Sequence, residues 1–134
     1  MKEKYIIGDL ILHTTETGEG RVGEILRENK NSCLVKFKNS IMETIFKENL
    51  KPIPLTMEIL EHNGFTVGNY NEWSNPKCEF LHFVIDSLDE NKWSVYARRT
   101  KDEVQLTTIK YVHELQHLLF GLGINIKIEI NESL

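Results

Sequence analysis

Turn-forming residues recur at short intervals through the first half of the chain and leave only short segments between them. Turns are predicted at Gly8-Asp9, at residues 17–20, at residues 28–32 and at Asn39-Ser40. In the segment 33–38, apolar Cys33, Val35 and Phe37 alternate with Leu34, Lys36 and Lys38, which is the period of a β-strand. Short strands joined by tight turns predict a small β-barrel over residues 1–53, because closure of a barrel removes exposed strand edges.

The segment Pro52-Ile53-Pro54 predicts a boundary between two parts of the chain, residues 1–53 and 54–134, because each proline forces its predecessor out of the helical region. Whether the two parts share one core stays open. The second part is predicted to be α+β, and no element is assigned to residues 66–79. The expected elements are a helix over 57–63 capped by Thr56 and ended by Gly64, a hairpin of 80–85 and 93–98, an amphipathic helix from Thr107 or Thr108 to Gly121, and a final strand over 124–130.

Composition narrows the class of protein. The 134 residues carry a formal net charge of −4, which argues against non-specific binding to nucleic acid. No apolar run is long enough for a membrane span, and the first residues do not resemble a signal peptide, so we expect a cytoplasmic protein. Cys33 and Cys78 have no CxxC partner and are expected to be reduced and buried.

Three strings in the first part resemble Tudor-like and SH3-like barrels. They are Ile7-Gly8-Asp9-Leu10-Ile11-Leu12-His13, Gly18-Glu19-Gly20-Arg21-Val22 and Leu34-Val35-Lys36-Phe37. Such barrels are accessory domains of some DNA helicases and transcription-coupled repair factors, where they usually dock another protein. The resemblance covers roughly residues 5–53 and implies a five-stranded barrel that binds a protein.

Two strings in the second part resemble a family of uncharacterised small proteins of gut bacteria and their phages. One is Pro52-Ile53-Pro54-Leu55-Thr56 leading to Gly64-Phe65, and the other runs from Tyr111-Val112-His113-Glu114-Leu115-Gln116 into Leu118-Leu119-Phe120. Members of that family carry Asn where this chain has His117. The resemblance implies a phage or mobile-element origin and no particular activity.

The segment His113-Glu114-Leu115-Gln116-His117 matches the H-E-x-x-H motif of zinc hydrolases. In such a site, His113 and His117 would bind Zn²⁺ from one face of a helix, and Glu114 would act as the general base. Helical periodicity, however, places both histidines opposite the apolar arc, on the solvated side. Glu129 or Glu132 could serve as the third ligand, but no adjacent helix is available to hold either. We therefore expect no catalytic residue, no metal ligand and no cofactor.

The basic pair Arg98-Arg99 and the aromatic Trp73 are the candidate ligand-binding residues, because together they could hold a phosphate and stack on a base. Three functions stay open. The favoured one is a non-enzymatic binding or adaptor protein that docks a host protein through its barrel. The alternatives are a protein that sequesters a nucleotide-like signal, with a homo-oligomer left open, and a zinc-dependent hydrolase.

Overall fold

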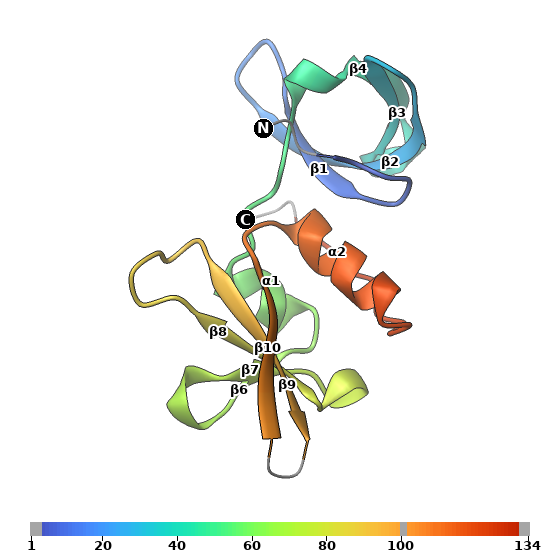
Figure 1. Cartoon of the computed structure of the whole chain (residues 1–134). Helices are drawn as coiled ribbons and strands as arrows, with labels where there is room; N and C mark the ends of the chain where they lie inside the picture. The colour runs from blue at the N-terminus through green and yellow to red at the C-terminus, as the bar shows by residue number, and fades with distance from the viewer. Residues whose placement is uncertain (1–3, 100–101, 132–134) are drawn as a thin grey trace. The chain divides into compact units, whose positions relative to one another are not determined.

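The structure is a computed structural model that describes residues 4–99 and 102–131. The chain divides into two compact units, one ending at Ile53 and the other spanning Pro54–Asn131. The fold is α+β: two antiparallel sheets hold most of the regular structure and two α-helices accompany the second sheet in the described residues (Figure 1). Neither of these helices has the length and apolar character that a membrane crossing requires.

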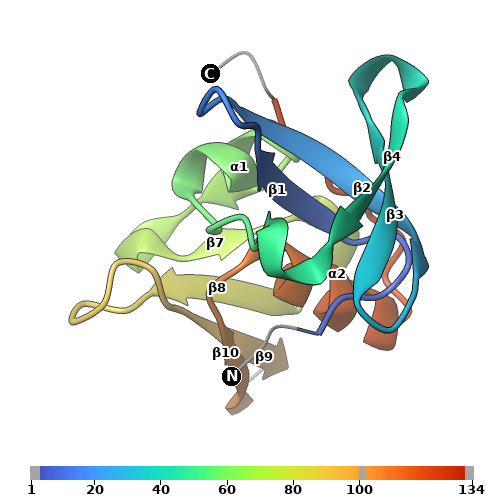
Figure 2. The same cartoon turned by 90° about the horizontal axis from the view of Figure 1, so that it is seen from above.

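The first unit is a five-stranded sheet with the strand order β4-β3-β2-β1-β5. The sheet curls into a half-barrel, which is seen nearly end-on in Figure 1 and from above in Figure 2. Short strands lie between the predicted turns, as expected, and a further short strand follows the 3₁₀ turn that comes after β4. The elements are β1 (Leu10–Thr14), β2 (Gly20–Glu28), β3 (Ser32–Phe37), η1 (Lys38–Ser40), β4 (Met42–Phe46), η2 (Lys47–Asn49) and β5 (Leu50–Lys51).

The concave side of this sheet holds the core of the first unit. As predicted, Cys33, Val35 and Phe37 all point inward from β3. Gly23 in β2 lies directly beneath two of these side chains, since a Cβ atom at this position would lie 2.8 Å from Phe37 Cε1 and closer still to Val35 Cγ1. The bend of the sheet thus depends on a residue without a side chain at position 23. The core comprises Tyr5, Ile11, Ile25, Cys33, Val35, Phe37, Ile45 and Leu50.

The second unit contains a five-stranded sheet with the order β10-β9-β8-β7-β6. The predicted first helix is confirmed, with Thr56 Oγ1 accepting a hydrogen bond from the N–H of Ile59 at 3.3 Å and Gly64 in the left-handed region at a φ of +85°. The predicted hairpin is confirmed as β8 and β9. The elements are α1 (Met57–His62), β6 (Thr66–Val67), η3 (Asn69–Asn71), β7 (Trp73–Ser74), η4 (Pro76–Cys78), β8 (Leu81–Ile85), β9 (Trp93–Arg99), β10 (Asp102–Ile109) and α2 (Val112–Gly121).

The predicted start of the last helix is wrong. Thr107 and Thr108 do not cap a helix, because both belong to β10 and pair with β9 opposite Val95 and Ser94. The branched side chain of threonine suits a strand, so the pairing with β9 prevails over the local capping preference. The helix α2 begins at Val112 and keeps its predicted end at Gly121.

The predicted final strand is also wrong, although its apolar period is real. Ile124, Ile126, Ile128 and Ile130 are more buried than the residues between them, yet residues 124–130 pair with no strand. Their backbone is held instead by Asn63, the residue that follows α1. The side chain of Asn63 accepts a hydrogen bond from the N–H of Glu129 at 2.7 Å and donates one to its carbonyl oxygen at 2.9 Å.

The second unit has its own core, in which aromatic and aliphatic side chains of the sheet meet those of the helices. Trp93 is fully buried, and its indole N–H donates a hydrogen bond to the carbonyl oxygen of Leu55 at 2.9 Å. Phe65 and Phe83 pack edge to face, with ring centroids 5.5 Å apart. The helix α2 contributes buried Val112, Leu115 and Leu119. Cys33 in the first unit and Cys78 in the second are both buried free thiols, as the sequence predicts.

Candidate functional site

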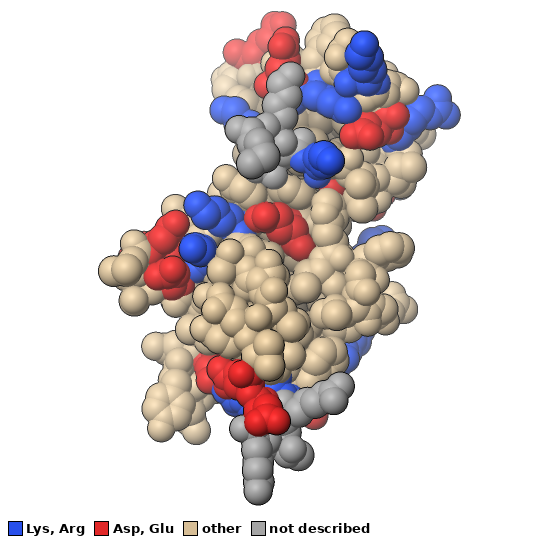
Figure 3. Space-filling model, viewed as in Figure 1, with Lys and Arg blue, Asp and Glu red and all other residues tan. Residues whose placement is uncertain are grey.

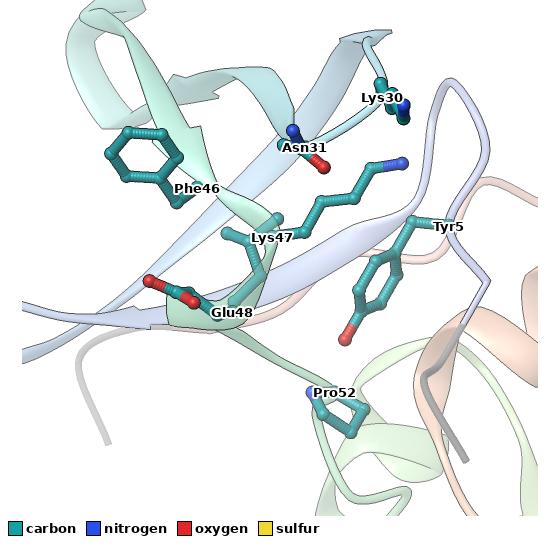
Figure 4. Close-up of a pocket in the computed structure, with 8 residues that line it drawn as sticks. Tyr5, Lys30, Asn31, Phe46, Lys47, Glu48 and Pro52 are labelled. Atoms are coloured by element: carbon teal, nitrogen blue, oxygen red, sulfur yellow. The ribbon is translucent and has the colours of Figure 1, made fainter.

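A groove with a volume of about 560 Å³ opens on the first unit, near the end of β4 (Figure 4). Four segments that are separated in the sequence form it: the residues before β1, the turn between β2 and β3, the end of β4 with η2, and β5 with the residue after it. The lining residues are Tyr5, Lys30, Asn31, Phe46, Lys47, Glu48, Leu50 and Pro52.

Backbone hydrogen bonds fix the geometry of this groove. The N–H of Lys47 donates to the carbonyl oxygen of Asn31 at 2.9 Å, which ties η2 to the turn between β2 and β3. The same turn is closed by a bond of 2.8 Å from the N–H of Asn29 to the carbonyl oxygen of Ser32. The groove is therefore formed by the backbone of the half-barrel rather than by a loose loop.

The groove combines apolar walls with an exposed aromatic ring. Tyr5 and Leu50 are buried members of the core, and Pro52 is half-buried. Phe46 is 63% exposed, because strand alternation turns its neighbour Ile45 into the core and Phe46 outward. An apolar ring that is left in water at the rim of a groove is a surface feature that favours binding.

Cationic side chains occupy one side of the groove. Figure 4 shows the side chains of Lys30 and Lys47 extending to the same side of it. Lys47 Nζ lies 3.1 Å from Glu28 Oε2, and Lys30 has no ion-pair partner among the described residues. Glu48 supplies one acidic group at the groove. The groove can therefore accept an apolar group next to a negative charge.

A second hollow on the same unit is polar, and its arginine is already paired. It has a volume of about 540 Å³, and its lining includes three threonines together with His13, Arg21 and Glu43. Arg21 donates from Nε to His13 Nδ1 at 3.1 Å, forms an ion pair with Glu43 at 2.6 Å, and its guanidinium carbon lies 3.8 Å from the centroid of the Phe37 ring. The hydrogen bond from Arg21 lowers the pKa of Glu43. This arrangement stabilises Arg21 within the fold and leaves it little capacity for an anion.

A site that binds a nucleotide-like ligand needs an open aromatic ring and an unpaired cation, and neither Trp73 nor Arg98 meets this need. Trp73 is only 8% exposed and pairs across the sheet with Phe83, so its ring is not open for stacking on a base. Arg98 forms ion pairs with Glu72 at 2.7 Å and Glu103 at 2.8 Å, and these carboxylates raise its pKa further above an already high value. Arg99 ends β9, but its side chain lies outside the described residues. A ligand site at these three residues stays a prediction without support from their geometry.

The H-E-x-x-H segment forms the first turns of α2. The expectation that both histidines lie on the solvated side is wrong, because His113 is only 2% exposed and His117 is half-buried. The ring of His113 stacks on Tyr111 and meets the ring of His117 edge to face, with centroids 5.8 and 5.5 Å away.

The carboxylate of Glu114 caps the N-terminus of α2. Its Oε1 accepts hydrogen bonds from the N–H groups of Lys110 at 2.8 Å and Tyr111 at 3.0 Å, which stabilises the start of the helix. The described part of the chain contains no group of three His, Cys, Asp or Glu side chains that could hold a metal ion. The zinc-hydrolase alternative stays a prediction, and Glu114 would have to give up its capping bonds to act as a base.

Sequence reasoning missed the groove on the first unit. Its residues come from segments with no common motif, and only the bend of the sheet brings them together. One signal was available: in a strand over 41–46 with Ile45 turned inward, Phe46 must point outward. Neither protein-family models nor curated proteins give a match to this chain, so the site rests on its own geometry.

Proposed function

We propose that this chain is a non-enzymatic binding protein whose first unit is a small SH3-like or Tudor-like barrel that docks a segment of another protein. The observation that carries the proposal is the exposed ring of Phe46 at the rim of a groove walled by Tyr5, Leu50 and Pro52. The strand order and the bend of the first sheet support the barrel type, and small barrels commonly use such grooves for peptides.

The position of β4 supports an extended occupant. β4 pairs with β3 on one side and lies at the end of the sheet order, so its other edge can align a peptide backbone. Met42 and Phe46 are both exposed and lie on the same face of β4. A peptide running along this strand would meet two apolar side chains and then the groove.

The charges beside the groove define the chemistry of the partner segment. Lys30, which has no ion-pair partner among the described residues, favours an acidic residue, and the apolar walls favour an aromatic or aliphatic side chain next to it. The expected occupant is therefore an extended protein segment with an apolar anchor adjacent to Asp or Glu. In the phage or mobile-element setting that the sequence resemblance implies, the partner would be a host protein.

The test is a selection of peptides from a random display library against the full chain, followed by titration of the selected peptides. We expect enrichment of segments with an apolar anchor beside an acidic residue, and amide chemical-shift changes at Asn31, Phe46 and Lys47 in two-dimensional NMR spectra. Phe46→Ala should weaken the selected peptides by about tenfold or more, because aromatic anchors dominate such interfaces.

Leu88→Ala is the matched control, since it also removes an exposed apolar side chain but lies on the second unit. It should leave the affinity unchanged. Two results would show that the groove is not the docking site. One is a selected peptide that changes amide chemical shifts only in the second unit. The other is an equal loss of peptide affinity in Phe46→Ala and Leu88→Ala.

A further inference from the structure

Asn63 and Gly64 form the one Asn-Gly pair of the sequence. An asparagine side chain is most reactive toward water in this setting, because glycine has no side chain to hinder the attack of its backbone nitrogen on the amide carbon of the asparagine. The attack closes a succinimide ring and releases ammonia. Water then opens the ring at either carbonyl group. The product is aspartate, or isoaspartate, in which the main chain runs through the former side chain.

In the folded chain the attacking nitrogen of Gly64 is held away from its target. Asn63 has a ψ of 19°, which turns the Gly64 nitrogen to the side opposite the Asn63 side chain. The N–H of Gly64 donates a hydrogen bond to the carbonyl oxygen of Glu61 at 3.2 Å. The carbonyl oxygen of Asn63 accepts one from Nδ2 of the buried Asn75, also at 3.2 Å. The peptide group between Asn63 and Gly64 is thus fixed at both its polar atoms.

The amide side chain of Asn63 is fixed as well. Its Nδ2 donates to the carbonyl oxygens of Ile59 at 2.7 Å and Glu129 at 2.9 Å, and its Oδ1 accepts from the N–H of Glu129 at 2.7 Å. Both amide hydrogens are used, so the group cannot turn toward Gly64 without breaking these bonds. Two of the three bonds end on Glu129. The reaction therefore requires that the segment 124–130 detach from Asn63.

The segment 124–130 can detach without disturbing a sheet, because it pairs with no strand. The contacts that hold it include the two bonds to Asn63 and the burial of Ile128, which is 4% exposed. At its start, the N–H of Ile124 donates to the carbonyl oxygen of Leu119 at 2.9 Å. A segment with so few fixed points opens locally at a lower cost than the unfolding of the whole unit.

We propose that Asn63 is a modification site, at which water replaces the side-chain amide by a carboxylate when the segment 124–130 opens, and that the product keeps the segment from closing again. One water is consumed and one ammonia is released, and nothing is oxidised or reduced. A carboxylate has no hydrogen to donate. It would face the carbonyl oxygens of Ile59 and Glu129 at the distances where Nδ2 now bonds to them, so repulsion replaces two hydrogen bonds. This site is independent of the groove on the first unit.

The first test is peptide mass spectrometry of the full chain after incubation at mildly alkaline pH, either folded or in urea. Asn63 should be converted in urea and should react more slowly in the folded chain, by about tenfold or more, because only the open segment reacts. Asn91 is the internal control. It is exposed in the loop between β8 and β9, where Figure 3 shows acidic and basic side chains on the surface, and it is followed by Lys92. In urea it should react more slowly than Asn63, since the side chain of Lys92 hinders the attack.

The second test changes the ease of opening. Ile128→Ala removes a buried side chain of the segment and should accelerate the conversion of Asn63 in the folded chain by about tenfold or more, with no change of the rate in urea. Lys127→Ala is the matched control, because it truncates an exposed side chain of the same segment and should leave both rates unchanged. Circular dichroism verifies that each variant is folded, and Ile128→Val is the milder variant if Ile128→Ala does not fold.

The third test places the product in the chain directly. In Asn63→Asp, amide hydrogen exchange at Glu129 should become faster by about tenfold or more, while exchange in β3 stays unchanged. Three results would each overturn the proposal. The first is an Asn63 that keeps its amide in urea. The second is an Ile128→Ala variant that reacts in the folded state no faster than Lys127→Ala. The third is an Asn63→Asp variant with the original exchange rate at Glu129.

Discussion

Gly23 shows how one residue decides the shape of the first unit. Val35 and Phe37 occupy the space where its Cβ would lie, and both belong to the core inside the half-barrel. The sequence shows a glycine inside a strand, which indicates a bulge or a close approach without saying which side chains approach. Only the pairing of β2 with β3 identifies them.

Gly23→Ala should destabilise the chain by about 1–3 kcal/mol, because the new methyl group forces Val35 or Phe37 out of place. The measurement is urea unfolding followed by circular dichroism. Gly20→Ala is the control in the same strand, where an added Cβ meets only Leu12 Cδ1 at 3.4 Å. An equal effect of the two substitutions would mean that Gly23 has no special packing role.

His113 and Trp73 show that the sequence alone does not predict the solvent exposure of a single side chain reliably. The period of the last helix puts His113 opposite the apolar residues, yet the structure buries it against Tyr111 and His117. Trp73 was a candidate for stacking on a ligand, and the structure buries it in β7. In both cases the surroundings of the element, which the sequence does not contain, decide the exposure.

At the scale of elements, an ion-pair network links three adjacent strands of the second sheet. Arg98 in β9 contacts Glu103 in β10 and Glu72, the residue before β7, while Glu72 Oε2 also lies 3.4 Å from His82 Nδ1 in β8. The hydrogen bond from Arg98 lowers the pKa of Glu72 in the folded chain. The network thus joins side chains of three consecutive strands and of the residue before β7.

This network predicts a dependence of stability on acid pH. Because the pKa of Glu72 is lower in the folded than in the unfolded chain, the ionised carboxylate contributes stability above its usual pKa, and this stability is lost as pH falls through the lowered value. Glu72→Gln cannot titrate, so its urea midpoint should fall less than that of the original chain between about pH 5 and pH 3. Midpoints measured over this range provide the test.

Glu79→Gln is the control for the acid range, since Glu79 is exposed and forms no ion pair with the described residues. Its midpoint should follow that of the original chain. A Glu72→Gln variant with an unchanged acid dependence would show that the network does not contribute to stability.

At the scale of the whole molecule, the last described segment is fixed by a residue far from it in the sequence. Asn63, at the end of α1, bonds to the N–H and the carbonyl oxygen of Glu129, and it also donates to the carbonyl oxygen of Ile59 at 2.7 Å. One amide side chain thus takes the place of the strand partner that the apolar period of residues 124–130 predicts.

Asn63→Ala should lower the free energy of unfolding by about 1–2 kcal/mol, because three hydrogen bonds of one side chain are lost and backbone groups are left to water. Amide hydrogen exchange at Glu129 should become faster, while exchange in β3 stays unchanged. The neighbouring His62→Ala, at an exposed position, is the control. Slow exchange at Glu129 in Asn63→Ala would show that the buried Ile128 alone holds the segment.

The sequence by itself determined the local features of this protein: β1 to β4 of the first sheet, the capped helix α1, the β8–β9 hairpin and the burial of both cysteines. Each follows from a period, a cap or a turn residue that acts within a few positions. The tertiary structure alone decided where β10 ends and α2 begins, how residues 124–130 are held, and which side chains line the groove beside Phe46. These features depend on hydrogen bonds and packing between residues that are distant in the sequence, and no local pattern records such partners.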